Sequence, residues 1–181
     1  MGVSQMITVE KLTPENFNAH SLDEFSRHQA VTECWRKVDG EWNLYPIAFT
    51  EDWDLEKRRQ IAGTIAGNLD GDMVDFGAFD GSRLVGYITL GTQALGSRGQ
   101  YRQLVEFEVS QEHRGMGVGR QLFTRLCGEA RGMGAEKLYI SAHSSKESQA
   151  AYRALGCTHA REIIPAIAEE EPCDVQMEYV L

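Results

Sequence analysis

A short strand that runs into a glycine-dense turn and then a helix constrains this chain more than any other feature. In residues 105–119, apolar and acidic side chains alternate up to Val109, and glycines stand at positions 115, 117 and 119. The alternation predicts a half-buried strand, and the apolar spacing after Gly117 predicts an amphipathic helix. Consecutive backbone N–H groups in such a turn, together with the positive end of a helix dipole, form a cradle for phosphate oxygens.

Two common phosphate-binding motifs do not fit this turn. A Walker A loop requires Lys and then Ser or Thr after its last glycine, whereas Gly119 is followed by Arg120 and Gln121. A dinucleotide fingerprint requires two residues between its second and third glycines, and only Val118 separates Gly117 from Gly119 here. The pattern that fits is Arg/Gln-x-x-Gly-x-Gly/Ala, with the arginine at position 114.

A second element, Tyr-x-x-x-Gly, occurs as Tyr152-Arg-Ala-Leu-Gly156 at the end of the next predicted helix. With both motifs at this separation, the chain resembles the GCN5-related N-acetyltransferase (GNAT) family over residues 76–156. The resemblance implies one N-acetyltransferase domain over residues 1–181, an α/β fold whose mixed sheet has splayed central strands. Residues 74–164 would carry the cofactor core, and residues 1–70 and 165–181 would determine which acceptor binds.

The pattern of apolar residues and turn formers predicts a mixed sheet with helices on its faces. Helix is expected at residues 14–27 and, interrupted at Asp39-Gly40 and Pro46, over most of 29–69. On the strand at 104–110, Leu104, Glu106, Glu108 and Ser110 are expected on one face. Asp80-Gly81-Ser82 predicts a hairpin turn. Strands are expected at 6–12, 74–79, 84–90, 104–110, 137–142, 157–164 and 174–180, a loop at 91–99, and helices from 117 to about 132 and from 144 or 145 to 155.

Composition narrows the function classes. The 181 residues are 42% hydrophobic and 25% charged, which is typical of an ordered globular chain. The net charge of −9 disfavours binding to nucleic acid or to an anionic membrane, and it favours a neutral or cationic substrate. The four cysteines show no metal-ligand spacing, and neither a signal peptide nor an 18-residue apolar run is present. We therefore expect no metal, no membrane span, reduced thiols and a cytoplasmic location.

The family resemblance implies acetyl-CoA as co-substrate, bound where the central strands part. Backbone groups at 107–109 would pair with the pantetheine arm, and N–H groups at 114–120 would hold the pyrophosphate. Ser145 stands where the family often has asparagine, so it would bond a pantetheine amide or cap the helix. The expected cofactor-binding residues are Phe107, Val109, Arg114, Gly115, Met116, Gly117, Val118, Gly119, Arg120 and Ser145.

The implied reaction is direct attack of an amine on the thioester, which requires a base for the amine and an acid for the leaving thiolate. Tyr152 matches the family tyrosine that serves the thiolate; otherwise it is a core residue of an amphipathic helix. The base is open between Glu106 and Glu108, which are either a functional pair with one raised pKa or a solvated pair. His143 is a third candidate, just beyond Ser141, which stands where some relatives carry a glutamate.

The acceptor is the least constrained part of the sequence analysis. Trp35, Trp42, Tyr45 and Trp53 could form an aromatic wall for a cation or the core of two short helices. Asp174, Glu178 and residues 169–171 could attract an ammonium group or simply be solvated. We expect a small-molecule amine. A peptide N-terminus or lysine, another acyl group, and a non-catalytic acetyl-CoA sensor are the alternatives, and a homodimer is compatible with the family.

Overall fold

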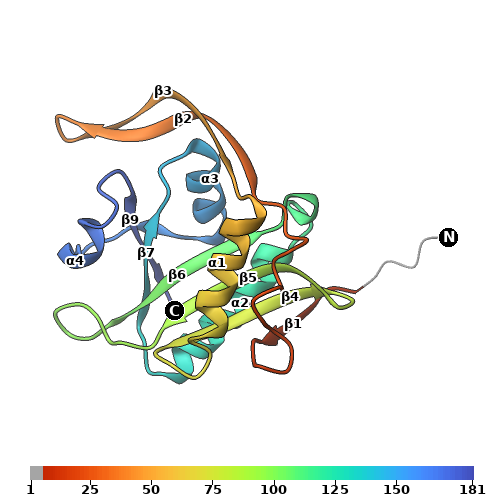
Figure 1. The fold of residues 1–181 in the computed structure, drawn as a ribbon. Helices are drawn as coiled ribbons and strands as arrows, with labels where there is room; N and C mark the ends of the chain where they lie inside the picture. Colours follow the sequence, from red (N-terminus) through yellow and green to blue (C-terminus); the bar gives the residue numbers. More distant parts are fainter. Residues whose placement is uncertain (1–5) are drawn as a thin grey trace.

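A computed structural model describes residues 6–181 and shows a mixed sheet covered on both faces (Figure 1). Strand β6 (Tyr101–Val109) lies at its centre, between the antiparallel β5 (Arg83–Gly91) and the parallel β7 (Lys137–Ala142). The order across the sheet is β1 (Thr8–Lys11), β4 (Met73–Asp80), β5, β6, β7, β9 (Val175–Val180) and β8 (Thr158–His159).

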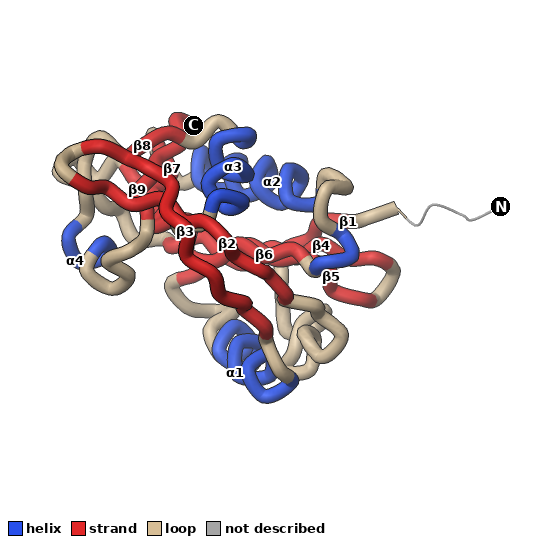
Figure 2. Tube along the Cα trace, turned by 90° about the horizontal axis from the view of Figure 1, so that it is seen from above, coloured by secondary structure: helices blue, strands red, loops and turns tan. Residues whose placement is uncertain are grey.

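Helices lie on opposite faces of this sheet, as Figure 2 shows. Helices α2 (Val118–Gly132) and α3 (Lys146–Leu155) lie on one face, where α2 buries Leu122, Leu126 and Ala130 against the strands. Helix α1 (Leu55–Ala66) lies on the other face, over a second core cluster that includes Tyr87. The short α4 (Pro165–Ala168) and the 3₁₀ turn η1 (Gln111–His113) complete the elements.

The prediction of helix over most of 29–69 is wrong, because its first half forms a long β-hairpin. Strands β2 (His28–Val38) and β3 (Glu41–Asp52) pair antiparallel in a separate two-stranded sheet. At the turn, Asp39 and Gly40 have φ of +52° and +84°, as a two-residue hairpin loop requires. The Asp-Gly pair favours a hairpin turn and the aromatic side chains favour strands. These preferences outweigh the helical spacing of the apolar residues in this segment. Only α1 of the predicted helical stretch exists.

Two further predictions at the ends of the chain need correction. Residues 14–27, expected as a helix, form a series of turns, from which Phe17, Leu22 and Phe25 enter the second core cluster. The strand expected over 157–164 is reduced to the two residues of β8. The hairpin at Asp80–Ser82, the loop after β5, and the strand over Lys137–Ala142 are confirmed.

A β-bulge in β6 changes which side chains share a face. Thr89 pairs with Glu106 and Leu90 with Leu104, so Val105 is an extra residue on β6. Leu104 therefore belongs to the core on the α2 side, against which Phe107 also packs. Its expected place on the Glu106 face is wrong, because an inserted residue reverses the alternation.

The predicted splay of the central strands is confirmed. Strands β6 and β7 pair only from Tyr101 to Leu104 and from Lys137 to Ile140. Beyond these residues the β7-facing edge of β6 pairs with no strand of the described chain, residues 6–181, whereas its other edge stays paired with β5. An extended ligand can add to such a free edge like a further strand. Over the described residues, no helix is both long and apolar enough to cross a membrane.

Candidate active site

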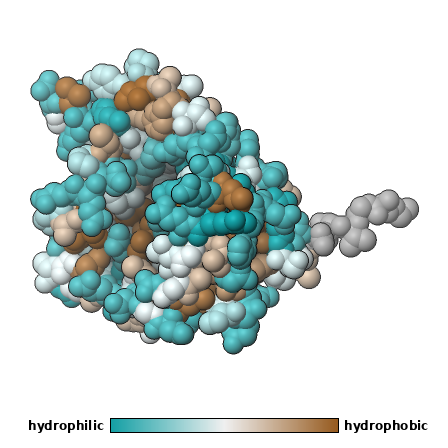
Figure 3. All heavy atoms as spheres, viewed as in Figure 1, coloured by the Kyte–Doolittle hydropathy of each residue, from teal (hydrophilic) through white to brown (hydrophobic). Residues whose placement is uncertain are grey.

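A cleft of about 760 Å³ opens where β6 and β7 part. Figure 3 shows one face of the molecule, on which most side chains are hydrophilic. A recess on this face separates the β2–β3 hairpin at the top from the rest of the molecule. The walls come from the start of β2, the second half of β6, the glycine turn, β7 and α3. The lining includes Arg27, His28, Gln29, Ala30, Val105, Glu106, Phe107, Glu108, Val109, Arg114, Gly115, Gly117, Gly119, Arg120, Ser141, His143, Glu147, Ser148, Tyr152 and Asp174.

The glycine turn forms one end of the cleft as an open backbone surface. Gly115 and Gly117 have φ of +73° and +83°, a conformation that disfavours side chains, and Gly117 is the N-cap of α2. A Cβ placed on either glycine would meet no atom within 4 Å. A Cβ on Gly119 would lie 3.4 Å from the Phe107 ring. The space in front of the helix N-terminus is therefore free for phosphate oxygens.

Two arginines tie this turn to the elements around it. Arg114 donates from Nε to the carbonyl of Val109 at 3.1 Å and from Nη1 to the carbonyl of His28 at 2.8 Å. Arg120 donates from Nη2 to the carbonyl of Ala154 at 3.3 Å. The two Arg114 hydrogen bonds fix the turn to β6 and to the start of the hairpin, and the Arg120 hydrogen bond fixes it to α3. Both guanidinium groups also give this end of the cleft positive charge.

Three of the ten expected cofactor-binding residues do not line the cleft. Met116 is 63% exposed and lies outside the lining, whereas Val118 is buried in the core against the sheet. Ser145 is fully buried as the N-cap of α3, where its Oγ accepts from the Ser148 N–H and from Gln29 Nε2. The capping role named for Ser145 is thus the one observed, whereas no side-chain contact with a ligand is open to it.

Tyr152 lines the cleft from α3. Its ring meets Phe107 edge-on, with 6.2 Å between the ring centroids. Burial raises the pKa of the Tyr152 phenol well above its ordinary value, and the negative charges of Glu108, Asp174 and Glu106 raise it further. The phenol therefore keeps its proton at neutral pH and is available as a donor to a developing negative charge.

The two candidate bases on β6 have different surroundings. Glu108 Oε2 lies 2.8 Å from Nε of Arg27, and Arg27 also donates from Nη2 to Glu51 Oε2 at 2.8 Å. The Arg27 side chain is only 9% exposed, so this arginine is a nearly buried bridge between two carboxylates. The Glu106 carboxylate, by contrast, has no ion pair or hydrogen bond with any residue from 6 to 181. Glu106 is thus the one of the pair whose oxygens are free in the cleft.

Desolvation by the surrounding protein raises the pKa of Glu106. The positive charge of Lys57 opposes this shift, and the negative charge of Asp75 adds to it. Asp75 itself is buried on β4 and accepts a hydrogen bond from the Thr89 hydroxyl. For Glu108, burial also raises the pKa, while the Arg27 guanidinium works against the rise.

His143 has both ring nitrogens engaged. Nδ1 accepts from the Ser145 N–H at 3.1 Å, which places the proton of the neutral ring on Nε2. Nε2 lies 3.4 Å from Glu51 Oε1. In this arrangement the ring has no free lone pair to take a proton from an amine, so His143 is better suited to orienting Glu51 than to acting as the base.

Comparison with known proteins decides the family. Residues 28–157 match the family model described as "Acetyltransferase (GNAT) family". The chain belongs to the GNAT family. It is therefore an acetyl-CoA-dependent N-acetyltransferase, as the glycine turn and Tyr152 predicted. A search of curated proteins found no significant match.

Several solved structures share this fold at low sequence identity. A nourseothricin acetyltransferase has a TM-score of 0.70 and 19% identity over 96% of this chain and 98% of its own. A putative streptothricin acetyltransferase from Bacillus anthracis, solved with acetyl coenzyme A, has a TM-score of 0.64 and 12% identity over 97% of this chain and 98% of its own. A PaiA N-acetyltransferase from Thermoplasma acidophilum, solved with coenzyme A, has a TM-score of 0.60 and 15% identity over 97% of this chain and 99% of its own.

The residues of this GNAT chain fit acetyl-CoA on two structural grounds. The helix N-terminus behind Gly117 is open, and the free edge of β6 leads from it toward Tyr152. When bound, acetyl-CoA supplies an activated acetyl thioester. Among residues 6–181, no group of three or more side chains is arranged to hold a metal ion.

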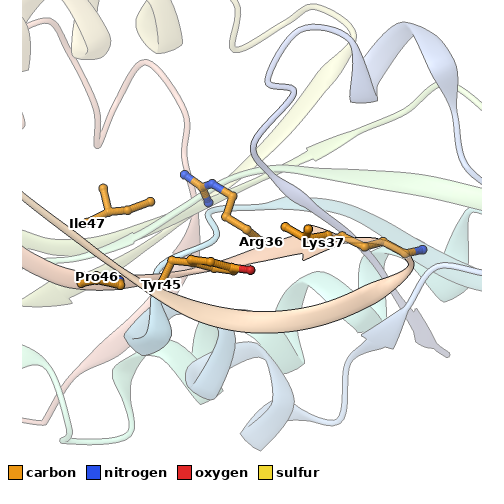
Figure 4. A pocket seen from close by; sticks show the side chains of 6 residues that line it. Arg36, Lys37, Tyr45, Pro46 and Ile47 are labelled. Atoms are coloured by element: carbon orange, nitrogen blue, oxygen red, sulfur yellow. The ribbon is translucent and has the colours of Figure 1, made fainter.

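The four aromatic residues form neither an aromatic wall nor the core of two short helices in this GNAT fold, but Trp42 and Trp53 do pack against the two core clusters. Trp35 packs under the Arg153 guanidinium at 5.0 Å, and Trp42 stacks on His159 with centroids 5.3 Å apart. Trp53 lies 5.7 Å from the Arg27 guanidinium. Tyr45 is exposed and lines a separate hollow of about 510 Å³ with Arg36, Lys37, Val38, Pro46 and Ile47 (Figure 4).

Sequence reasoning missed the residues that organise the acceptor side of this GNAT cleft. Arg27 precedes β2 and Glu51 lies near the end of β3, and only the tertiary fold brings Arg27 to Glu108. No local motif marks either of them. The one available signal was the Asp39-Gly40 turn, which would have placed the two ends of the hairpin, and hence Arg27 and Glu51, side by side.

Proposed function

We propose that this enzyme transfers acetyl from acetyl-CoA directly to a primary amine of a small cationic molecule. The observation that carries this proposal is the polarity of the cleft. Its glycine-turn end has Arg114, Arg120 and a helix N-terminus, which suit phosphates. Around the Tyr152 phenol, three carboxylates are close enough to raise its pKa, and such an environment favours an ammonium group.

The different surroundings of the two glutamates support Glu106 as the base. Its carboxylate is unpaired, and its raised pKa brings it closer to the value at which a general base is effective. Glu108 instead serves as the counter-ion of Arg27. The amine gives a proton to Glu106, directly or through water, and its nitrogen attacks the thioester carbonyl. The carbon–sulfur bond breaks and Tyr152 donates its proton to the leaving sulfur. The nitrogen then loses a second proton, which returns through solvent to the Tyr152 phenolate, and the neutral amide results.

A small acceptor is supported by the elements around the cleft. The hairpin begins at its rim, where Arg27, His28 and Gln29 form one wall, so an acceptor must fit beneath this wall. Two fold neighbours are described by their names as nourseothricin and streptothricin acetyltransferases. All four cysteines are unpaired, which supports the predicted reducing, cytoplasmic location. The predicted homodimer stays a prediction.

The test is thiol release from acetyl-CoA with a panel of small amines, amino acids, aminoglycosides and lysine peptides. We expect thiol release with small cationic amines, and mass spectrometry should find one acetyl group on the product. Protein incubated with acetyl-CoA alone should show no acetyl-enzyme by intact mass. Transfer to peptides but not to small amines would contradict the proposed acceptor. Binding of acetyl-CoA without any turnover would instead identify a sensor.

A further inference from the structure

Asp174, immediately before β9, is a second cleft carboxylate without a positively charged partner. Its side chain lines the cleft and contributes to the charge felt by the Tyr152 phenol. Oδ2 accepts from the Ser141 hydroxyl at 3.1 Å, and Oδ1 has no partner among residues 6–181. Asp174 therefore has one oxygen fixed to the protein and one free to meet a ligand.

A chain of oriented hydrogen bonds, which ends at the Ser141 hydroxyl, fixes the Asp174 carboxylate. The Ile164 N–H donates to the Tyr139 hydroxyl at 3.1 Å, and this hydroxyl donates to Gln176 Oε1 at 2.6 Å. Gln176 Nε2 then donates to Ser141 Oγ at 3.0 Å, which leaves the Ser141 proton for Asp174. Every hydroxyl in this chain of hydrogen bonds has its direction set by its neighbours. Asp174 is held as an oriented acceptor rather than as a mobile surface carboxylate.

Two other carboxylates at or beside the cleft, Glu51 and Glu108, are compensated. Glu51 faces Arg27 through one oxygen and His143 through the other, and Glu108 faces Arg27. Asp174 lies near His143, Glu171 and Glu51, of which the last two add negative charge. Burial raises the pKa of Asp174, so its ionised form is disfavoured until a cation approaches.

Glu106 and Asp174 thus have no ion-pair partner among residues 6–181, and they lie on opposite sides of the splay. Glu106 projects from β6, and Asp174 is held beside β7 through Ser141. Both carboxylates and the Tyr152 side chain line the same cleft, so the site of acetyl transfer lies within reach of each. A ligand that compensates both must carry two positive charges.

We infer that Asp174 binds a second cationic nitrogen of the acceptor, while the reacting amine lies near Glu106. The acceptors are then diamines, polyamines or other molecules with at least two cationic nitrogens. This inference rests on the proposed function, because it requires small amines to be acetylated. Asp174 determines specificity and takes no part in proton transfer.

The experiment compares butylamine with diaminobutane as acceptors of the whole protein. For the unmodified enzyme we expect kcat/KM to be about ten- to hundredfold higher for the diamine, which is typical of a charge-assisted hydrogen bond. Asp174→Asn, which keeps an oxygen for Ser141, should lower kcat/KM for the diamine far more than for butylamine, so that the preference disappears, and should leave the Kd of acetyl-CoA unchanged.

Glu171→Gln is the matched control, because it removes one nearby negative charge that is exposed and outside the cleft lining. It should keep the preference for the diamine. An equal loss for both amines in Asp174→Asn would overturn the inference and give Asp174 a role in the reaction or the fold. The absence of any diamine preference in the unmodified enzyme would also overturn it while leaving the proposed function intact. If neither amine is acetylated although acetyl-CoA binds, the proposed function fails and the inference fails with it.

Discussion

The two ends of the cleft are built on different principles. The glycine-turn end comes from one continuous stretch, residues 107–120, and presents mainly backbone groups. The acceptor end comes from distant parts of the chain, with Arg27 before β2, Glu51 on β3, Glu106 on β6 and Asp174 before β9. Backbone groups keep their place when most side chains change, whereas an ion-paired cluster depends on every member. The two ends should therefore respond differently to substitution.

Gly117→Glu should have the largest effect at the backbone end. The new side chain would enter the open space before α2 and bring a negative charge to the phosphate site, at a φ that disfavours it. We expect acetyl-CoA affinity to fall more than a thousandfold, about 4 kcal/mol, measured by calorimetric titration.

Two controls separate the causes of that loss. Gly117→Ala carries the backbone strain with little bulk and no charge, and it should retain most of the affinity. Gly128→Glu places the same charge on an exposed position of α2 and should bind normally. Normal binding by folded Gly117→Glu would show that the turn does not hold phosphates.

Tyr152→Phe tests the point where the two ends meet. Removal of the only donated proton should lower kcat by about a hundredfold or more, with the Kd of acetyl-CoA unchanged. Rapid-quench single-turnover assays with the best amine measure the chemical step directly. Tyr45→Phe, on the outer hairpin, is the matched control and should be fully active. Unchanged turnover in Tyr152→Phe would make Tyr152 a packing residue.

Glu106→Gln and Glu108→Gln should distinguish the residue that takes part in the reaction from the residue that stabilises the fold at the acceptor end. The rate of the unmodified enzyme should rise with pH through the raised pKa of Glu106, because only the ionised carboxylate accepts a proton. Glu106→Gln should lower kcat at least tenfold and lose this acidic limb of the pH–rate profile.

Glu108→Gln should keep the acidic limb. It should instead destabilise the fold, since Arg27 is nearly buried and would be left with Glu51 alone. Urea unfolding at neutral pH measures this loss. If Glu108→Gln removed the limb and Glu106→Gln kept it, the proposed roles of the two residues would be reversed.

Arg153→Gln should give the smallest effect. It removes the guanidinium over Trp35, one of the contacts between α3 and the hairpin. Because Arg153 is exposed, we expect a loss of only about 0.5–1 kcal/mol in the free energy of unfolding and unchanged acetyl-CoA affinity. Arg131→Gln, exposed at the end of α2, is the control. A loss of several kcal/mol would mean that the hairpin depends on this contact far more than its exposure suggests.

Local sequence was sufficient wherever neighbouring residues dictate the backbone. The turn at Asp80–Ser82, the ends of α3 at Ser145 and Gly156, and the positive φ of Gly117 all follow from the residues at those positions. Local sequence was insufficient for the hairpin, where apolar residues fit helical spacing and strand alternation alike. The bulge at Val105 was also hidden, because a single inserted residue leaves no mark on composition.

By itself the sequence determined the family, the cofactor turn and the position of Tyr152, because these depend on backbone conformation and on spacing within one segment. The tertiary structure alone decided that Arg27 joins Glu51 to Glu108, that Glu106 stays unpaired, and that Ser141 orients Asp174. Each of these contacts joins residues at least 24 positions apart. Ion pairs and oriented hydrogen bonds form only when the fold brings charges within about 3–4 Å of each other, and no local pattern encodes that meeting.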